Sequence, residues 1–303
     1  MDFIEKMQEN TIKSGMVAIV GPPNAGKSTL LNGLLGQKIS IVTPKPQTTR
    51  NRIIGILNDP SYQIVMLDTP GLHKGGKPLN LEMVKIAVAS LSEVDAILFL
   101  VDVSQPAPEK QMKAVEYLEG AASPVILVLN KIDLLQKDQL LPIIEVYRNI
   151  YPFTAIVPIS ALTNNGTDVL LQELVHLMPK GPKLYPEDIP TDATERFIVA
   201  EIIREKIFLL TGQEIPYSAA VVIDSFKEEE ERSLVTIHAT IVVEKSSQKA
   251  IIIGKKGLKL QQIGKNSRLD MEKLLAQRVL LKLWVKVHKN WTKDMRFIRD
   301  LGL

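Results

Sequence analysis

The stretch GPPNAGKST, residues 21–29, decides the fold of the first half of the chain. It follows the apolar run MVAIV (16–20) and leads into LLNGLL (30–35), so it joins an expected strand to an expected helix. In that context the pattern G-x-x-x-x-G-K-[ST] predicts a phosphate-binding loop. Its glycines allow backbone N–H groups to point at phosphate oxygens, its lysine meets the β- and γ-phosphates, and its serine hydroxyl holds Mg²⁺.

Apolar runs and helix-like stretches alternate along residues 1–178. Several of the runs are unbroken Val, Ile and Leu, which is typical of strands buried on both faces of a parallel sheet. The alternation predicts an α/β domain with a doubly wound sheet. Its expected strands are 16–20, 51–57, 62–67, 96–103, 124–130 and 155–160, and its expected helices lie near 28–35, 80–92, 108–119, 136–149 and 167–177.

Three more motifs come directly after expected strands: DTPG (68–71), NKID (130–133) and SAL (160–162). Loops at the carboxyl ends of strands form the ligand crevice of an open α/β sheet. Asp68 suits a water-mediated contact with Mg²⁺, and the Gly71 N–H suits the γ-phosphate. The SAL loop is placed to close over a base.

Asp133 identifies that base. Its carboxylate can accept hydrogen bonds from N1–H and the N2 amino group of guanine, a donor pair that adenine lacks. The motifs therefore predict a site for GTP and GDP. Its expected residues are Gly21, Asn24, Ala25, Gly26, Lys27, Ser28, Thr29, Asp68, Gly71, Asn130, Lys131, Asp133, Ser160, Ala161 and Leu162.

Composition narrows the class of protein. A chain of 303 residues suggests two domains. The absence of Cys excludes disulfides and thiol nucleophiles, and the four His are too scattered to predict a His-based metal site. No apolar run approaches the roughly 20 residues of a membrane span. The N-terminal stretch lacks the apolar core of a signal peptide, so we expect a cytoplasmic protein.

Positive charge is concentrated near the C-terminal end. Residues 1–179 hold 15 Lys and Arg against 17 Asp and Glu, whereas residues 245–303 hold 15 against 4. Such an imbalance predicts a polyanionic partner, either nucleic acid or an anionic membrane surface, although a solvated basic face is the alternative.

The order of expected elements changes after residue 178. The stretch MPKGPKLYPEDIPTD (178–192) is rich in proline and predicts a linker, placed at 179–193, that continues neither helix nor sheet. Beyond it the pattern predicts a helix at 194–212, strands at 216–226 and 233–244, a short helix, a helix at 258–276 and a strand at 279–288. The order α-β-β-α-α-β predicts a compact α+β domain over residues 194–303.

The motifs above resemble those of translation-factor-type GTPases, and specifically the Era branch of the Era/TrmE-type bacterial GTPases. Further segments that carry the resemblance are GQKISIVTPKPQTTR (36–50), LDTPGLH (67–73), IPYS (215–218), IIIGKKG (251–257) and LWVKV (283–287). The resemblance covers nearly the whole chain. It implies a P-loop GTPase domain at 1–178 followed by a type II KH domain.

The resemblance also implies a switch segment around QTTR (47–50). It assigns Thr49, or less favourably Thr48, to Mg²⁺ and the γ-phosphate, which gives Ser28, Thr49 and Asp68 as metal ligands and Lys27, Thr49 and Gly71 as catalytic residues. Leu72 stands where many GTPases carry a water-orienting Gln, and the neighbouring His73 is a minority candidate for a base. We therefore expect slow intrinsic hydrolysis.

Asn24 leaves two interpretations open. In related GTPases an Asn at this position helps to bind K⁺, which stabilises charge at the bridge between the β- and γ-phosphates. Alternatively Asn24 is a turn residue that bonds to its own backbone.

The sequence Gly254-Lys255-Lys256-Gly257 fits the G-x-x-G loop of a KH domain. Glycines allow an RNA backbone to approach closely, lysines meet phosphates, and the apolar neighbours Ile252 and Ile253 could face bases. The expected RNA-binding residues are Ile253, Gly254, Lys255, Lys256, Gly257, Lys259, Lys265 and Arg268. A tight turn between two packed helices is the alternative.

The resemblance implies that the RNA is the 3′ end of 16S ribosomal RNA, that the role is biogenesis of the 30S subunit, and that the protein works as a monomer. Another interpretation is a membrane-associated signalling GTPase coupled to the cell cycle, with its basic end on anionic lipid. Peripheral association with the inner membrane is compatible with both.

Overall fold

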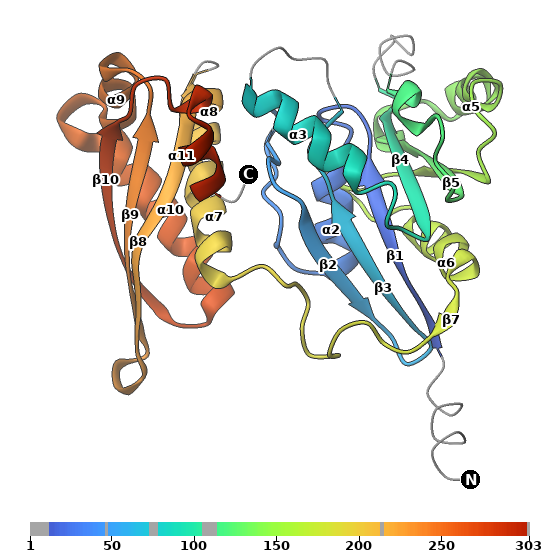
Figure 1. Ribbon diagram of the computed structural model, residues 1–303, viewed down its shortest axis with the longest axis horizontal. Coiled ribbons are helices and arrows are strands. Elements are labelled where there is room, and N and C mark those ends of the chain that lie inside the picture. Colours follow the sequence, from blue (N-terminus) through green and yellow to red (C-terminus); the bar gives the residue numbers. More distant parts are fainter. Residues whose placement is uncertain (1–11, 46–47, 73–77, 105–113, 213–214, 302–303) are drawn as a thin grey trace. The chain divides into compact units, whose positions relative to one another are not determined.

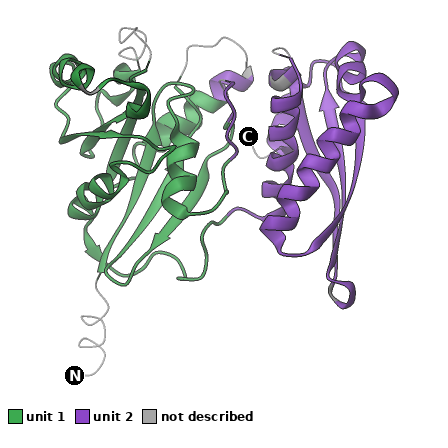
Figure 2. Ribbon diagram, turned by 180° about the vertical axis from the view of Figure 1, so that it is seen from behind, with its two compact units in different colours: residues 1–40, 49–74, 83–192 green, residues 41–48, 75–82, 193–303 purple. Residues whose placement is uncertain are grey.

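The computed structural model describes residues 12–45, 48–72, 78–104, 114–212 and 215–301 (Figure 1). These residues form two compact units. Unit 1 consists of residues 1–40, 49–74 and 83–192, and unit 2 of residues 41–48, 75–82 and 193–303 (Figure 2). The chain thus enters unit 2 for a short segment after residue 40 and returns to unit 1 at Thr49.

The sheet of unit 1 has the order β2-β3-β1-β4-β5-β6. Strands β1, β3, β4, β5 and β6 run parallel to one another, whereas β2 runs antiparallel to β3. Only residues 59–61 join β2 to β3, which is too short for the crossover that parallel strands need. Their bounds are β1 (Ile12–Val20), β2 (Ile53–Asn58), β3 (Tyr62–Asp68), β4 (Ala96–Asp102), β5 (Val125–Asn130) and β6 (Ala155–Ile159).

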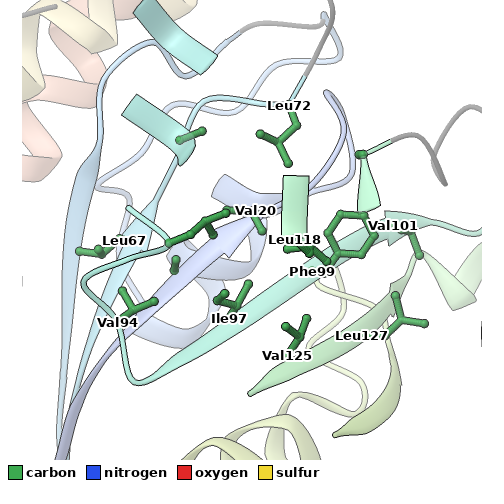
Figure 3. Close-up of a cluster of buried hydrophobic side chains, with 14 of the residues drawn as sticks. Val20, Leu67, Leu72, Val94, Ile97, Phe99, Val101, Leu118, Val125 and Leu127 are labelled. Carbon is green, nitrogen blue, oxygen red and sulfur yellow. The ribbon is translucent and has the colours of Figure 1, made fainter. Parts of the chain in front are cut away.

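Helices cover both faces of this sheet, as the doubly wound pattern predicts. Helix α3 (Pro78–Ala89), a 3-10 helix at Val115–Leu118 and α5 (Leu140–Arg148) contribute to one buried cluster. In Figure 3 the side chains of this cluster from β1, β4 and β5 lie together, among them Val20, Phe99 and Leu127. The remaining α-helices among the described residues of the unit are α2 (Lys27–Leu35) and α6 (Thr167–Leu177).

One predicted helix, near 108–119, falls largely outside the described part of the chain, which omits residues 105–113. Of its described residues, Val115–Leu118 form a 3-10 helix. The other predicted strands and helices of unit 1 are confirmed, with bounds that shift by a few residues.

The predicted linker differs from expectation in one respect. Lys180 and Gly181 form a short strand, β7, that pairs antiparallel with Ile12 and Lys13 of β1, so the segment does extend the sheet. The prolines at positions 179 and 182 flank this pair and need not donate to the ladder. Further along, the segment is fastened by Gln63, whose Oε1 accepts from the N–H groups of Leu184 (2.6 Å) and Tyr185 (2.9 Å).

Unit 2 has the predicted α-β-β-α-α-β order. Its sheet has the order β10-β9-β8, in which β9 pairs antiparallel with β8 and parallel with β10. Helices α7, α9 and α10 pack against these strands around buried residues such as Ile203, Ile241 and Ile263. The bounds are α7 (Glu195–Leu210), α8 (Ile215–Ser218), β8 (Ala219–Glu229), β9 (Leu234–Val243), α9 (Ser246–Ile253), α10 (Leu258–Leu275), β10 (Arg278–Val287) and α11 (Met295–Asp300).

Within the ranges that the structure describes, every helix is too short or too polar to cross a membrane.

Candidate functional site

The phosphate-binding loop lies at the carboxyl end of β1, between β3 and β4, which is the switch point of the sheet. Gly21 has a φ of 147° and Gly26 a φ of 98°. A Cβ on Gly21 would lie 2.2 Å from the Leu100 carbonyl oxygen, and a Cβ on Gly26 would lie 2.2 Å from Asn130 Nδ2. Both positions therefore require glycine for conformational and for steric reasons.

Lys27 begins α2, and its ammonium group is folded back into the loop. Its Nζ donates to the backbone oxygens of Gly21 (3.1 Å) and Pro22 (2.9 Å). Burial lowers the pKa of Lys27 to about 8, and the nearby Asp68 carboxylate opposes that shift. A buried cation that contacts carbonyl oxygens would be stabilised by a charge-assisted hydrogen bond to a phosphate anion.

Oxygen atoms from distant parts of the chain converge beside this lysine. Ser28 Oγ lies 2.9 Å from Thr49 Oγ1 and donates to Asp68 Oδ2 at 2.6 Å. Ser40 Oγ also donates to Asp68 Oδ2, at 2.8 Å. Burial raises the pKa of the Asp68 carboxyl, and its hydrogen bond with Ser28 opposes this.

These residues fit a magnesium ion. Asp68 Oδ1 is buried and has no hydrogen-bond partner among the described residues. Hydroxyl and carboxylate oxygens are the donors that Mg²⁺ prefers, and it keeps several waters of its own. Thr48 lies elsewhere, with its hydroxyl 2.7 Å from that of Thr43. The geometry therefore favours Thr49 over Thr48.

Ser40 and Asn32 are site residues that the motifs do not reveal. Asn32 Oδ1 accepts from the N–H groups of Ile39 (2.9 Å) and Ser40 (3.0 Å), and its Nδ2 donates to the Ser40 carbonyl (2.7 Å). Asn32 thus fixes the backbone that carries the Ser40 hydroxyl to Asp68. The signal in the sequence was a lone Asn inside an apolar helix.

On the base side, Asn130 joins three loops. Its Nδ2 donates to the Ala25 carbonyl (2.7 Å), and its Oδ1 accepts from the N–H groups of Lys131 (2.8 Å) and Ala161 (2.9 Å). Asn130 is buried, so its role in this structure is to position the loops. The SAL loop is thereby fixed against the phosphate-binding loop.

The other residues of the base side differ in exposure. Lys131 pairs with Asp102 at 2.5 Å, a partner at the end of β4 that the motifs do not include. Asp133 and Leu162 are exposed and accessible to a base, whereas Ser160 is fully buried. Thr29 and Ser28 follow Lys27 in the first turn of α2, whose N–H groups face the loop.

Leu72 is part of the hydrophobic core. Its side chain is 3% exposed and packs in the buried cluster with Val20, Phe99 and Val101 (Figure 3). Its N–H donates to the Gly21 carbonyl at 3.0 Å. The side chain is thus held in the core rather than presented to solvent. His73 lies outside the described residues.

Gly71 and Asn24 are the remaining predicted residues of the phosphate side. A Cβ on Gly71 would lie 3.0 Å from Pro23 Cα, so the DTPG turn meets the phosphate-binding loop directly. Asn24 is exposed and has a φ of 62°, the conformation of a turn residue. Both interpretations of Asn24 remain compatible with this position.

In unit 2 the G-x-x-G loop joins α9 to α10, as predicted. Gly254 has a φ of 72°, Lys256 of 51° and Gly257 of 79°, so the loop turns sharply and presents Lys255 and Lys256 to solvent. One expectation is wrong: Ile252 is fully buried in the core of the unit and cannot face a base. Ile253 is partly buried, and Lys265 and Arg268 are exposed.

A groove runs from this loop along α10 and the edge strand β10. Its cavity volume is about 820 Å³, and it combines an apolar floor with basic side chains. Arg268 Nε lies 3.8 Å from Glu272 Oε1, and the Arg268 side chain is 48% exposed. The β10 side of the groove was not predicted, because only the folded sheet brings it to the loop. The lining residues are Gly257, Leu258, Leu260, Gln261, Gln262, Gly264, Lys265, Arg268, Val279, Leu280, Leu281 and Leu283.

Known proteins resemble both units. A family model described as a 50S ribosome-binding GTPase matches residues 16–131, and a KH domain model matches residues 214–292. GTPase Era of Syntrophus aciditrophicus (strain SB) is 52% identical over 290 residues, which are 96% of this chain and 95% of that protein. GTPase Era of Geobacter metallireducens is 52% identical over 296 residues, 98% of this chain and 99% of that protein.

Two solved structures extend this likeness to the fold. A variant of Aquifex aeolicus Era bound to GDP.AlF4⁻ has a TM-score of 0.93 and 42% identity, and the match covers 96% of this chain and 99% of that one. Era in complex with MgGDPNP and nucleotides 1506–1542 of 16S ribosomal RNA has a TM-score of 0.91, with the same identity and coverage. The phosphate-binding loop, the NKID motif and the KH unit, together with these relatives, show that the chain is a GTPase of the Era family.

Proposed function

We propose that this protein is a GTP-driven switch that binds the 3′ end of 16S ribosomal RNA and acts in biogenesis of the 30S subunit. The observation that carries the proposal is the pairing of a guanine-nucleotide site with a basic, apolar-floored groove beside a G-x-x-G loop. The relative solved with MgGDPNP and 16S nucleotides supports the choice of RNA.

In the nucleotide site, Lys27 and the loop N–H groups hold the β- and γ-phosphates, and Asp133 selects guanine. Ser28, Thr49 and Asp68 would hold Mg²⁺, which neutralises charge on the phosphate oxygens when bound. Leu72 is buried and takes the place of a water-orienting Gln. The described residues therefore promote hydrolysis only by positioning the nucleotide and by stabilising charge, so the proposed intrinsic rate is slow.

Replacing Asp133→Asn tests the base assignment. The amide cannot accept from both guanine donors but can donate to the extra carbonyl of xanthine, so affinity should move from GDP to xanthosine diphosphate. Asp138→Asn, at a nearby exposed position, is the control and should keep guanine preference. Unchanged GDP affinity in Asp133→Asn would remove Asp133 from the base site.

In the KH unit, Lys255 and Lys256 meet the RNA backbone, while the apolar floor of the groove receives bases. The double replacement Lys255→Glu with Lys256→Glu should lower RNA affinity by roughly tenfold or more and leave GTP affinity nearly unchanged. Lys289→Glu with Lys293→Glu carries the same charge change at exposed positions of the same unit. RNA affinity that is unaltered by the first pair would refute the site.

Asn24 carries a further proposal, a K⁺ ion that stabilises charge between the β- and γ-phosphates. Single-turnover hydrolysis should then be faster in KCl than in NaCl, and Asn24→Ala should remove the difference. Equal rates in both salts would leave Asn24 as a turn residue.

We place this function in the cytoplasm, with the protein as a monomer. Peripheral contact with the inner membrane is tested by flotation with anionic liposomes alongside RNA capture.

A further inference from the structure

Strand β10 presents a second surface, on the side of the sheet away from its core. Its residues alternate: Val279 and Val285 are buried, whereas Lys282, Trp284 and Lys286 are exposed. On the same face of the neighbouring strand, His238 lies opposite Lys282 and Thr240 opposite Trp284. We call the face formed by Lys282, Trp284, Lys286 and His238 the tryptophan face.

Trp284 is unusual for its size and exposure. Its side chain is 49% exposed, although a Trp of this kind is normally largely buried. The indole packs against His238 with ring centroids 5.4 Å apart and an interplanar angle of 68°, an edge-to-face contact. The contact covers part of the indole, and about half of the residue's surface stays in water.

The charges around Trp284 favour an anionic partner. Lys282 and Lys286 flank it on the same strand, and Lys227 and Arg278 lie further out on the same side of the sheet. The opposing charges among the described residues are Glu229, across the sheet from Arg278, and Asp224, which accepts a hydrogen bond from Thr240 at 2.7 Å. An excess of cations centred on an exposed aromatic ring is typical of a surface that binds single-stranded nucleic acid.

The face is continuous with the groove beside the G-x-x-G loop. Leu280 lines that groove, is 45% exposed, and lies on the same side of β10 as Trp284. β10 is the edge strand of the described sheet. An RNA chain that leaves the groove can therefore pass around this edge and reach the tryptophan face directly.

From this we propose that the tryptophan face is a second RNA contact, on which a base outside the G-x-x-G groove stacks against Trp284 while Lys282 and Lys286 meet the adjacent phosphates. The proposal rests on the proposed RNA-binding function and adds a site to it. The same use of an open sheet with aromatic side chains is found in other single-strand RNA-binding modules.

Tryptophan fluorescence reads this surface directly. The chain has two Trp. Trp291 is fully buried and donates its Nε1–H to the Ser218 carbonyl at 2.8 Å. Of the two Trp, RNA can therefore contact Trp284 but not Trp291. Titration of the full chain with RNA of the sequence of nucleotides 1506–1542 should quench the Trp284 signal. Trp284→Phe should remove the quenching and keep most of the affinity, because phenylalanine still stacks.

Trp284→Ala should weaken binding of this RNA roughly 5- to 100-fold. Lys282→Gln with Lys286→Gln should reduce the slope of log affinity against log salt by about 1 to 2. The matched control, Lys289→Gln with Lys293→Gln, should leave binding unchanged. Trp284 is exposed, so these variants should keep the thermal midpoint of the parent protein.

The outcomes separate the two proposals. If the parent protein binds RNA and Lys255→Glu with Lys256→Glu weakens binding as predicted, but Trp284→Ala binds normally, the tryptophan face is refuted and the RNA-binding function stands. If the parent protein binds no RNA, both fail. If Trp284→Ala loses flotation with phosphatidylglycerol vesicles and keeps its RNA affinity, the face is a membrane contact and the proposal is overturned.

Discussion

Lys27 is the residue whose chemistry depends most on its surroundings. Its ammonium is buried against two backbone carbonyls, and burial lowers its pKa to about 8. A bound polyphosphate would stabilise the charged form and raise that pKa again. The nucleotide site is therefore linked to proton binding in the alkaline range.

Nucleotide binding should take up a proton near and above pH 8. Above this pH Lys27 is largely neutral in the free protein and becomes charged in the complex. GDP affinity should therefore fall with rising pH, by up to about tenfold per pH unit. Calorimetry at pH 8.5 in buffers of different ionisation enthalpy measures the uptake. GMP carries the same base without the β-phosphate and should take up no proton. Equal uptake with GMP would exclude Lys27 as its source.

Leu72 leads to a second expectation at this scale. A glutamine there would not restore a water-orienting group, because the side chain packs in the core at 3% exposure. Leu72→Gln should instead lower the free energy of unfolding by about 2 to 3 kcal/mol, since it buries an unpaired amide.

Urea denaturation measures this loss, and single-turnover hydrolysis checks the rate. Leu141→Gln, at a position 74% exposed, is the matched control and should be nearly neutral. A faster hydrolysis rate in Leu72→Gln with unchanged stability would contradict the account.

At the scale of elements, the order of strands and helices was predictable because each element has a local signature. Unbroken apolar runs mark β4 and β5, and the glycine-rich motif marks the turn from β1 to α2. The motif residues could be predicted to lie together, since they follow strands whose carboxyl ends share one edge of the sheet.

The remaining features depend on contacts between distant segments, which local patterns do not encode. Ser40 reaches Asp68 only because Asn32 fixes its backbone, and Asp102 meets Lys131 only in the folded sheet. The β7 pairing shows the same limit, because a proline-rich segment by itself indicates only the absence of helix.

Gln63 makes the docking of the segment 179–192 testable. Its side chain is fully buried and bonds to the backbone of Leu184 and Tyr185. Gln63→Leu should lower the free energy of unfolding by about 1 to 3 kcal/mol, because it removes the acceptor of the part-buried N–H groups of Leu184 and Tyr185. Hydrogen exchange should rise at Leu184 and Tyr185. Gln37→Leu, at an exposed position, should leave both measurements unchanged; unaltered exchange in Gln63→Leu would show that other contacts hold the segment.

At the scale of the whole molecule, the segment 41–48 connects the two functions along the chain. It leaves unit 1 after Ser40, returns at Thr49, and within unit 2 it is bound to α7. Glu205 Oε1 accepts from the Val42 N–H at 3.1 Å, and the Arg204 guanidinium donates to the Thr48 carbonyl. Along the sequence the segment thus follows Ser40 and precedes Thr49, while its described residues Val42 and Thr48 bond to α7 of unit 2.

Lys45 adds three hydrogen bonds to this attachment. Its Nζ donates to the carbonyls of Phe208, Thr211 (2.6 Å) and Gly212, which lie at the C-terminal end of α7. A cation there also complements the helix dipole, and burial lowers the pKa of Lys45. Lys45→Ala should weaken the link between nucleotide state and RNA affinity. Lys38→Ala, at an exposed position just before this segment, is the control.

The central claim is that the nucleotide in unit 1 sets the RNA affinity of unit 2. The most direct test is the dissociation constant of the full chain for RNA of nucleotides 1506–1542, measured with MgGDPNP and with MgGDP at one salt concentration. We predict tighter binding with MgGDPNP by roughly fivefold or more, and a smaller ratio in Lys45→Ala. The same RNA affinity with both nucleotides in the parent protein would contradict the claim.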